Sequence, residues 1–121
     1  MDPATGTSTF LNETVKHIFA LKGERLGSGW SDYVEDNLLI RLHGFEILMA
    51  AYSMAHMRIG LTLAESGYKP SRRAPRLGVY LTNTLEAPGD DDHSLLGLLG
   101  MGRTLTEESN EADKVKRDLP I

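Results

Sequence analysis

The chain has 121 residues and a mass of 13.3 kDa, so it forms one domain or a part of one. Its 40% hydrophobic and 25% charged residues are ordinary for a globular protein, and no apolar run is long enough to cross a bilayer. The absence of cysteine excludes disulfides and thiolate metal sites, so we expect a cytoplasmic protein without membrane contact.

The net charge of −4 comes from the last part of the chain. Nine acidic and nine basic residues cancel through Pro88, and eight acidic residues stand against four basic ones from Gly89 onward. An acidic surface does not bind nucleic acid by itself. If a parent protein acts on DNA, most phosphate contacts must come from its other parts.

The first predicted feature is a strand end that leads through small residues into a helix. Asp2 precedes a small-residue stretch that contains Gly6, and an apolar pattern of helical period begins at Phe10. Small side chains let a ligand approach the backbone, and the N–H groups of a helix start point toward it. We predict a nucleotide-type binding corner, then a helix over about residues 8–22 that ends near Gly23.

A short helix is predicted after a loop rich in glycine and serine over residues 23–31. Ser31 and Asp32 offer its N-cap, and the helix covers about residues 33–39. Trp30 is interpreted as a hydrophobic staple rather than as the lining of a pocket.

A strand over residues 40–47 and a long helix over residues 48–66 come next. The strand ends in an acid, Glu46. The helix carries apolar residues on two faces, which predicts burial between two layers. Its methionines, Met49, Met54 and Met57, are interpreted as core filling.

The remaining chain contains a basic loop over residues 69–76, a strand over residues 77–82 with Asn83 at its end, and a polar helix over about residues 106–117. The basic loop could touch phosphate, but an exposed linker is the simpler interpretation. Asp90-Asp91-Asp92-His93 is interpreted as a solvated loop and not as a metal site, because consecutive acids point in different directions.

This order of helices and strands predicts an α/β fold with a mostly parallel sheet and covering helices. A strand is expected to lead into Asp2 and another to begin at about residues 119–121, so residues 1–121 read as a partial domain whose flanking strands are missing. Exposed sheet edges then favour self-association. Open α/β sheets bind ligands beyond the carboxyl ends of their strands.

The opening turn resembles motif I of the S-adenosylmethionine-dependent DNA methyltransferases, and most of all the N6-adenine (amino) methyltransferases of bacterial restriction-modification systems. That family has D-P-A-T-G-T-G-T-F-L, and this chain has D-P-A-T-G-T-S-T-F-L. The departure is Ser8, which is small enough for the loop and could cap the helix with its hydroxyl. A positive φ at this position would make serine a liability.

Two further motifs follow in the family's order. Gly44-Phe45-Glu46-Ile47 resembles motif II, and the next helix contains the subgroup's Y-x-x-A-H pattern from Tyr52 to His56. Asn83-Thr84-Leu85 stands where motif III often has G-D-T-L. The run L-T-N-T-L-E is similar to a version in the type ISP-like enzymes with helicase and methylase parts.

The resemblance implies a Rossmann-like S-adenosylmethionine-dependent methyltransferase fold, present in part. Glu46 would accept hydrogen bonds from the cofactor ribose, and Asn83 would read the adenine amino group. The cofactor-binding residues implied are Asp2, Pro3, Ala4, Thr5, Gly6, Thr7, Thr9, Phe10, Glu46, Ile47, Asn83, Thr84 and Leu85.

The family's catalytic motif, N-P-P-Y or D-P-P-Y, is not found in this chain. It holds the flipped target base, so we expect the isolated chain to contain no catalytic residue and to methylate no DNA. DNA would be bound through other parts of the parent protein. A non-catalytic interaction module on a decayed methyltransferase scaffold is the main alternative. A nicotinamide or flavin dinucleotide domain would need G-x-G-x-x-G, and Gly6 stands alone.

Overall fold

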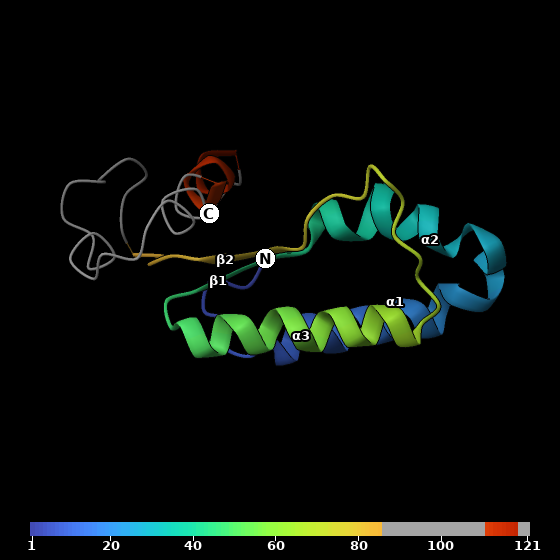
Figure 1. The fold of residues 1–121 in the computed structure, drawn as a ribbon, viewed down its shortest axis with the longest axis horizontal. Coiled ribbons are helices and arrows are strands. Elements are labelled where there is room, and N and C mark those ends of the chain that lie inside the picture. The colour runs from blue at the N-terminus through green and yellow to red at the C-terminus, as the bar shows by residue number, and fades with distance from the viewer. Residues whose placement is uncertain (86–110, 119–121) are drawn as a thin grey trace.

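The computed structural model describes residues 1–85 and 111–118, which form an α/β fold (Figure 1). The small sheet lies in the middle, with α1 and α3 side by side on one face and the helix of residues 111–118 on the other. In chain order the elements are α1 (Thr9–Leu26), η1 (Gly27–Gly29), α2 (Trp30–Tyr33), η2 (Val34–Leu38), η3 (Leu39–Arg41), β1 (His43–Glu46), α3 (Met49–Glu65) and β2 (Gly78–Leu81).

The sheet is parallel, as the sequence predicts. β1 pairs with β2, and Asp2 forms a parallel bridge with Gly44 on the other side of β1. The Asp2 N–H donates to the His43 carbonyl at 2.8 Å, and the Phe45 N–H donates to the Asp2 carbonyl at 3.0 Å. The order across the sheet is therefore the opening segment, β1 and β2.

Side chains that alternate along the strands build a core on each face of the sheet. Phe45 and Tyr80 face the helix of residues 111–118 and pack there against Ala112. Val79 lies on the other face, in the larger cluster. The other buried members of that cluster are Leu11, Val15, Trp30, Val34, Leu38, Leu39, Leu42, Ala55, Ile59 and Leu63.

Gly44 allows the opening loop to lie directly on β1. A Cβ at this position would stand 2.8 Å from Leu11 Cδ1, 2.9 Å from Thr5 Oγ1 and 3.0 Å from Thr5 Cβ. These distances are shorter than real Cβ contacts. The loop and the start of α1 therefore approach the strand so closely that a side chain at position 44 would force Leu11 or Thr5 to shift.

The prediction that the first helix ends near Gly23 is wrong. α1 continues to Leu26 and ends at Gly27, whose φ is +50° and whose N–H donates to the Gly23 carbonyl. Gly23 is buried within the helix, and a Cβ there would lie 2.4 Å from the Phe19 ring. Gly23 leaves room for that ring, which lies 5.0 Å from the Trp30 ring.

The predicted loop over residues 23–31 is consequently mostly helical. The chain is helical again from Gly27 and α2 begins at Trp30, so Ser31 lies inside α2 and is not its cap. The Ser31 hydroxyl instead accepts a hydrogen bond from the Lys69 N–H at 3.0 Å. Trp30 packs in the core, because it is 3% exposed and its Nε1 donates to the Ser66 hydroxyl. It is the first residue of α2, so the prediction that it precedes the helix as a hydrophobic staple is wrong.

The prediction that α3 is buried on two faces is also wrong. Ala55, Ile59 and Leu63, spaced four residues apart, face the core. Met54 and Met57 are 52% and 67% exposed, and Met49 is 42% exposed. These methionines do not fill the core, because no layer covers the outer side of α3 in the described ranges.

The free edge of β2 is partly capped by side chains. Two groups approach the Val79 carbonyl: His56 Nε2 at 3.1 Å and Arg76 Nη2 at 3.2 Å. Side chains of this kind blunt an edge, and self-association through sheet edges remains a prediction. No helix within residues 1–85 and 111–118 has the length and apolar character needed to span a membrane.

We predict that Gly44→Ala lowers the free energy of unfolding by about 1–3 kcal/mol, because the added methyl group would overpack the loop against β1. Urea unfolding followed by circular dichroism would measure this. Gly60→Ala is the matched control, since nothing lies within 4 Å of its Cβ position on α3. The control should be stabilising by up to about 1 kcal/mol, and equal effects of the two variants would contradict the close approach at Gly44.

Candidate functional site

The opening loop forms a tight turn around two left-handed residues. Gly6 has a φ of +55°, and Ser8 has a φ of 61°. The loop is tied to β1 by the Thr5 N–H, which donates to the Phe45 carbonyl at 2.9 Å. In the part of the chain that the structure describes, the N–H groups of Gly6 and Thr7 donate no hydrogen bond. These donors are therefore available to a ligand.

The predicted helix-capping role of Ser8 is wrong. Ser8 occupies the N-cap position of α1, but its side chain makes no capping hydrogen bond. Its buried hydroxyl lies 2.9 Å from Thr5 Oγ1, so the two hydroxyls satisfy each other. Ser8 therefore has the positive φ that the sequence analysis named as unfavourable for serine, because a Cβ is disfavoured in a left-handed backbone.

Glu46 stands at the carboxyl end of β1 and is oriented by the backbone that follows it. Its Oε1 accepts hydrogen bonds from the Ile47 and Leu48 N–H groups, both at 2.9 Å. Its Oε2 lies 4.0 Å from the position that a Cβ at Gly6 would occupy. The carboxylate of the second strand end thus adjoins the glycine of the opening loop.

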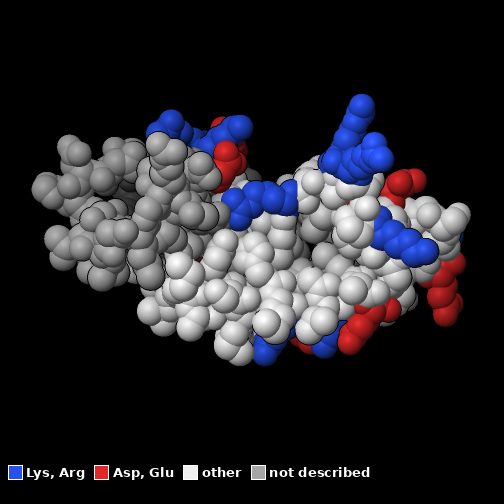
Figure 2. All heavy atoms as spheres, in the orientation of Figure 1, with Lys and Arg blue, Asp and Glu red and all other residues white. Residues whose placement is uncertain are grey.

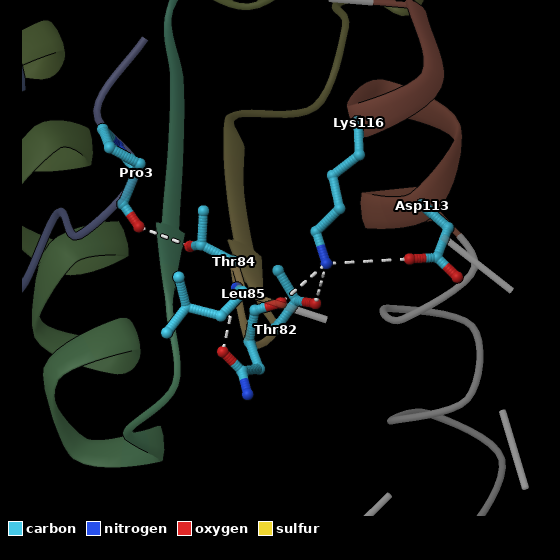
Figure 3. Close-up of polar contacts among 7 residues, drawn as sticks. Pro3, Thr82, Thr84, Leu85, Asp113 and Lys116 are labelled. Carbon is cyan, nitrogen blue, oxygen red and sulfur yellow. Dashed lines mark hydrogen bonds and ion pairs between the residues drawn. The ribbon is translucent and has the colours of Figure 1, made fainter. Parts of the chain in front are cut away.

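The end of β2 is joined to the same loop. The Thr84 hydroxyl donates to the Pro3 carbonyl, and Figure 3 shows this hydrogen bond between the two segments. Asn83 Oδ1 accepts from the Leu85 N–H at 3.0 Å, as a turn residue does. All three predicted strand ends therefore meet at one edge of the sheet.

Lys116 holds the end of β2 from the helix of residues 111–118. It is 8% exposed, and its ammonium donates to the Thr82 hydroxyl at 2.9 Å and to the Asn83 carbonyl at 2.8 Å (Figure 3). Asp113 lies 3.7 Å from the same ammonium. Sequence reasoning missed this lysine. Its spacing of three residues from Asp113, beside an apolar helix face, was the available signal.

Exposed apolar side chains follow the strand ends and the opening loop along the chain. Phe10 is 80% exposed and Leu85 is 94% exposed. Ile47 and Leu48, which follow Glu46, are 58% and 64% exposed. This edge therefore presents a carboxylate, unpaired N–H groups and apolar surface together, which are the groups that bind a nucleoside.

Thr5 and Thr9 lie differently from the other predicted residues. Thr5 is buried and its side chain points toward Gly44, so only its backbone could meet a ligand. Thr9 Oγ1 accepts a hydrogen bond from Arg58 at 2.9 Å and borders a hollow of about 450 Å³ between α1 and α3. A second hollow of about 480 Å³ lies beside Trp30, and neither hollow includes Glu46.

Metal chemistry finds no support in the described ranges. No group of three or more His, Cys, Asp or Glu residues there could hold a metal ion. The acidic stretch at residues 90–93, the predicted start of the last helix and the predicted final strand lie outside the described residues.

No protein-family model and no curated protein sequence matches this chain. A solved structure of a nuclease-deletion mutant of the Type ISP restriction-modification enzyme LlaGI, in complex with a DNA substrate mimic, is similar in fold. The match has a TM-score of 0.65 and 24% sequence identity, and it covers 99% of this chain. The chain spans 9% of the length of that protein.

We predict that Ser8→Gly is more stable than Ser8→Ala by about 1 kcal/mol, because glycine adopts a left-handed backbone without the steric cost of a Cβ. Both variants lose the hydroxyl contact with Thr5, so their difference isolates the backbone effect. Thermal unfolding of the pair would measure it. Equal stabilities would show that Ser8 carries no strain.

We predict that Lys116→Met lowers the free energy of unfolding by about 1–3 kcal/mol, since it removes two hydrogen bonds from the end of β2. Lys114→Met is the matched control, because Lys114 is exposed on the same helix. The control should change stability by no more than about 0.5 kcal/mol. Equal losses in urea unfolding would contradict the role assigned to Lys116.

Proposed function

We propose that this chain is the S-adenosylmethionine-binding part of a DNA adenine-N6 methyltransferase from a restriction-modification enzyme. The observation that carries the proposal is the placement of Glu46 beside Gly6 at the carboxyl edge of a parallel sheet. A carboxylate at such a strand end accepts hydrogen bonds from ribose hydroxyls, while a glycine loop admits the rest of the ligand.

The other residues near the carboxyl ends of the strands would contact different parts of the cofactor. The unpaired N–H groups of Gly6 and Thr7 would face the carboxylate of the methionine part of the cofactor. Ile47 and Leu85 would cover the faces of the adenine ring, and Asn83 would lie at its rim. Asp2, Pro3, Ala4, Thr5, Thr9, Phe10 and Thr84 shape the surrounding loop.

The strand order supports a ligand at this position. The opening segment lies at one side of β1 and β2 lies at the other. Counted along the chain, with the opening segment first, β1 second and β2 third, the order across the sheet is 3-2-1. Doubly wound sheets with this order continue with a fourth strand beside the first and bind ligands at that point of reversal. The opening loop occupies that side of the sheet.

The DNA part of the proposal rests on the motif resemblance and on the fold similarity to a restriction-modification enzyme that was solved with a DNA mimic. The catalytic N-P-P-Y motif is not in the chain. Cofactor chemistry supplies the methyl group, and protein residues must orient the acceptor amine. We therefore infer that the isolated chain binds the cofactor and transfers no methyl group.

A non-catalytic interaction module is the second candidate. Two observations favour it: the left-handed Ser8 in place of a glycine, and Asn83 Oδ1, which is already engaged by the Leu85 N–H. Such a module would keep the scaffold and bind no S-adenosylmethionine.

We predict that calorimetry detects S-adenosylmethionine binding to the chain and that Glu46→Gln weakens it by roughly tenfold to a hundredfold. That range corresponds to hydrogen bonds with a charged acceptor. Glutamine keeps an oxygen for the Ile47 and Leu48 N–H groups but loses the charge that the ribose needs.

Glu65→Gln is the matched control, because it removes an exposed acid of α3 far along the chain from the strand ends. It should leave the affinity unchanged. An unmodified chain that binds no S-adenosylmethionine would exclude the first candidate and support the second.

A further inference from the structure

The segment of residues 69–76, between α3 and β2, is the most basic stretch of the described chain. It contains Lys69, Arg72, Arg73 and Arg76 and no acidic residue. All four are exposed. Figure 2 shows Lys and Arg side chains standing together at the top of the molecule, where Figure 1 places this segment above the helical stretch that follows α1.

Three of these cations have no acidic partner among the residues that the structure describes. Lys69, Arg72 and Arg73 form no ion pair with any residue in the ranges 1–85 and 111–118. Arg76 is different, because it lies 4.6 Å from the centre of the Tyr80 ring and donates to the Val79 carbonyl. The segment thus presents four exposed charges, and the Arg76 guanidinium also contacts β2.

The segment is anchored to the preceding helical stretch by Glu35. The Glu35 carboxylate accepts hydrogen bonds from the Ser71 N–H at 2.8 Å, the Ser71 hydroxyl at 2.7 Å and the Tyr68 hydroxyl at 3.2 Å. The Lys69 N–H donates to Ser31, and the Arg73 N–H donates to the Ser71 hydroxyl. A loop held in this way loses little conformational entropy when it binds a partner.

Glu35 anchors the loop through Ser71 and Tyr68 and forms no ion pair with the loop's cations among the described residues. The Ser71 N–H and hydroxyl lower the pKa of Glu35, so the carboxylate stays ionised and bonded to Ser71 at neutral pH. Two prolines, Pro70 and Pro75, further restrict the backbone. The anchoring and the charge of the loop therefore come from different residues and can be changed separately.

We propose that Lys69, Arg72 and Arg73 bind the phosphate backbone of double-stranded DNA, an inference that rests on the proposed function for the choice of partner. Guanidinium groups pair with phosphate oxygens through two parallel hydrogen bonds. The segment itself contains no aromatic residue on which a base could stack, and the preceding Tyr68 packs against the core cluster. The contact therefore fixes the position of the duplex and reads no sequence.

The position of this loop separates it from the candidate cofactor site. The loop precedes β2 and lies at its amino end, whereas Glu46 and Asn83 lie at the carboxyl ends of the strands. Figure 1 shows the segment entering β2 at one end of the strand, with the carboxyl end of β2 at the other. DNA bound at this loop would be held away from the carboxyl ends of the strands, where the proposed function presents the target base.

The test is the salt dependence of binding of a short labelled DNA duplex to the full chain, followed by fluorescence anisotropy. Each phosphate contact contributes about 0.9 to the slope of log affinity against log salt. We expect Arg72→Gln/Arg73→Gln to reduce that slope by about 2, equally for duplexes of different sequence. Lys16→Gln/Lys114→Gln is the matched control, because it removes the same two positive charges from α1 and from the helix of residues 111–118, outside the loop.

An unchanged slope in the loop variant, or an equal reduction in the control, would overturn the proposal. Displacement of the duplex by polyglutamate as readily as by unlabelled DNA would also overturn it, because the loop would then bind acidic protein surfaces. Calorimetry with S-adenosylmethionine on the loop variant separates the two proposals. The loop inference stands if DNA binding depends on the arginines, whether or not the chain binds the cofactor.

A second variant tests the anchoring. Ser71→Ala keeps every charge of the loop and removes the hydroxyl that bonds Glu35 and the Arg73 N–H. We expect weaker binding with an unchanged salt slope, since the number of phosphate contacts stays the same. A changed slope would contradict the idea that Ser71 acts by holding the loop.

Discussion

The opening segment lies so close to β1 because position 44 carries no side chain. Leu11 and Thr5 occupy the space in which a Cβ would stand, at 2.8 Å and 2.9 Å. The Asp2 bridge and the Thr5 hydrogen bond to the Phe45 carbonyl both depend on this approach. This approach brings the glycine loop to Glu46 and the three strand ends to the same end of the sheet.

The two ends of the strands have different chemistry. The carboxyl ends gather a carboxylate, unpaired N–H groups and exposed apolar side chains around Glu46. The amino end of β2 carries a basic loop anchored by Glu35. In a parallel sheet all strands point the same way. A nucleoside site at the carboxyl ends of the strands and a phosphate-binding loop at their amino ends therefore need not share residues.

Local signals in the sequence were sufficient for most of the fold and for the members of the candidate site. The alternation of helices and strands predicted a parallel sheet, and Glu46 and Asn83 were placed at the ends of their strands. These predictions succeed because strand ends, helix ends and turns depend on neighbouring residues along the chain. The binding role of the strand-end residues stays a prediction.

The sequence by itself determined which residues stand at the strand ends and in what order. Only the tertiary structure decided how far α1 extends, because a ring contact between Phe19 and Trp30 needs the space that Gly23 leaves inside the helix. It also decided which face of α3 is buried and that Lys116 reaches the end of β2. Each of these depends on contacts between segments distant in sequence, and hydrophobic periodicity carries no information about which partner an apolar face will meet.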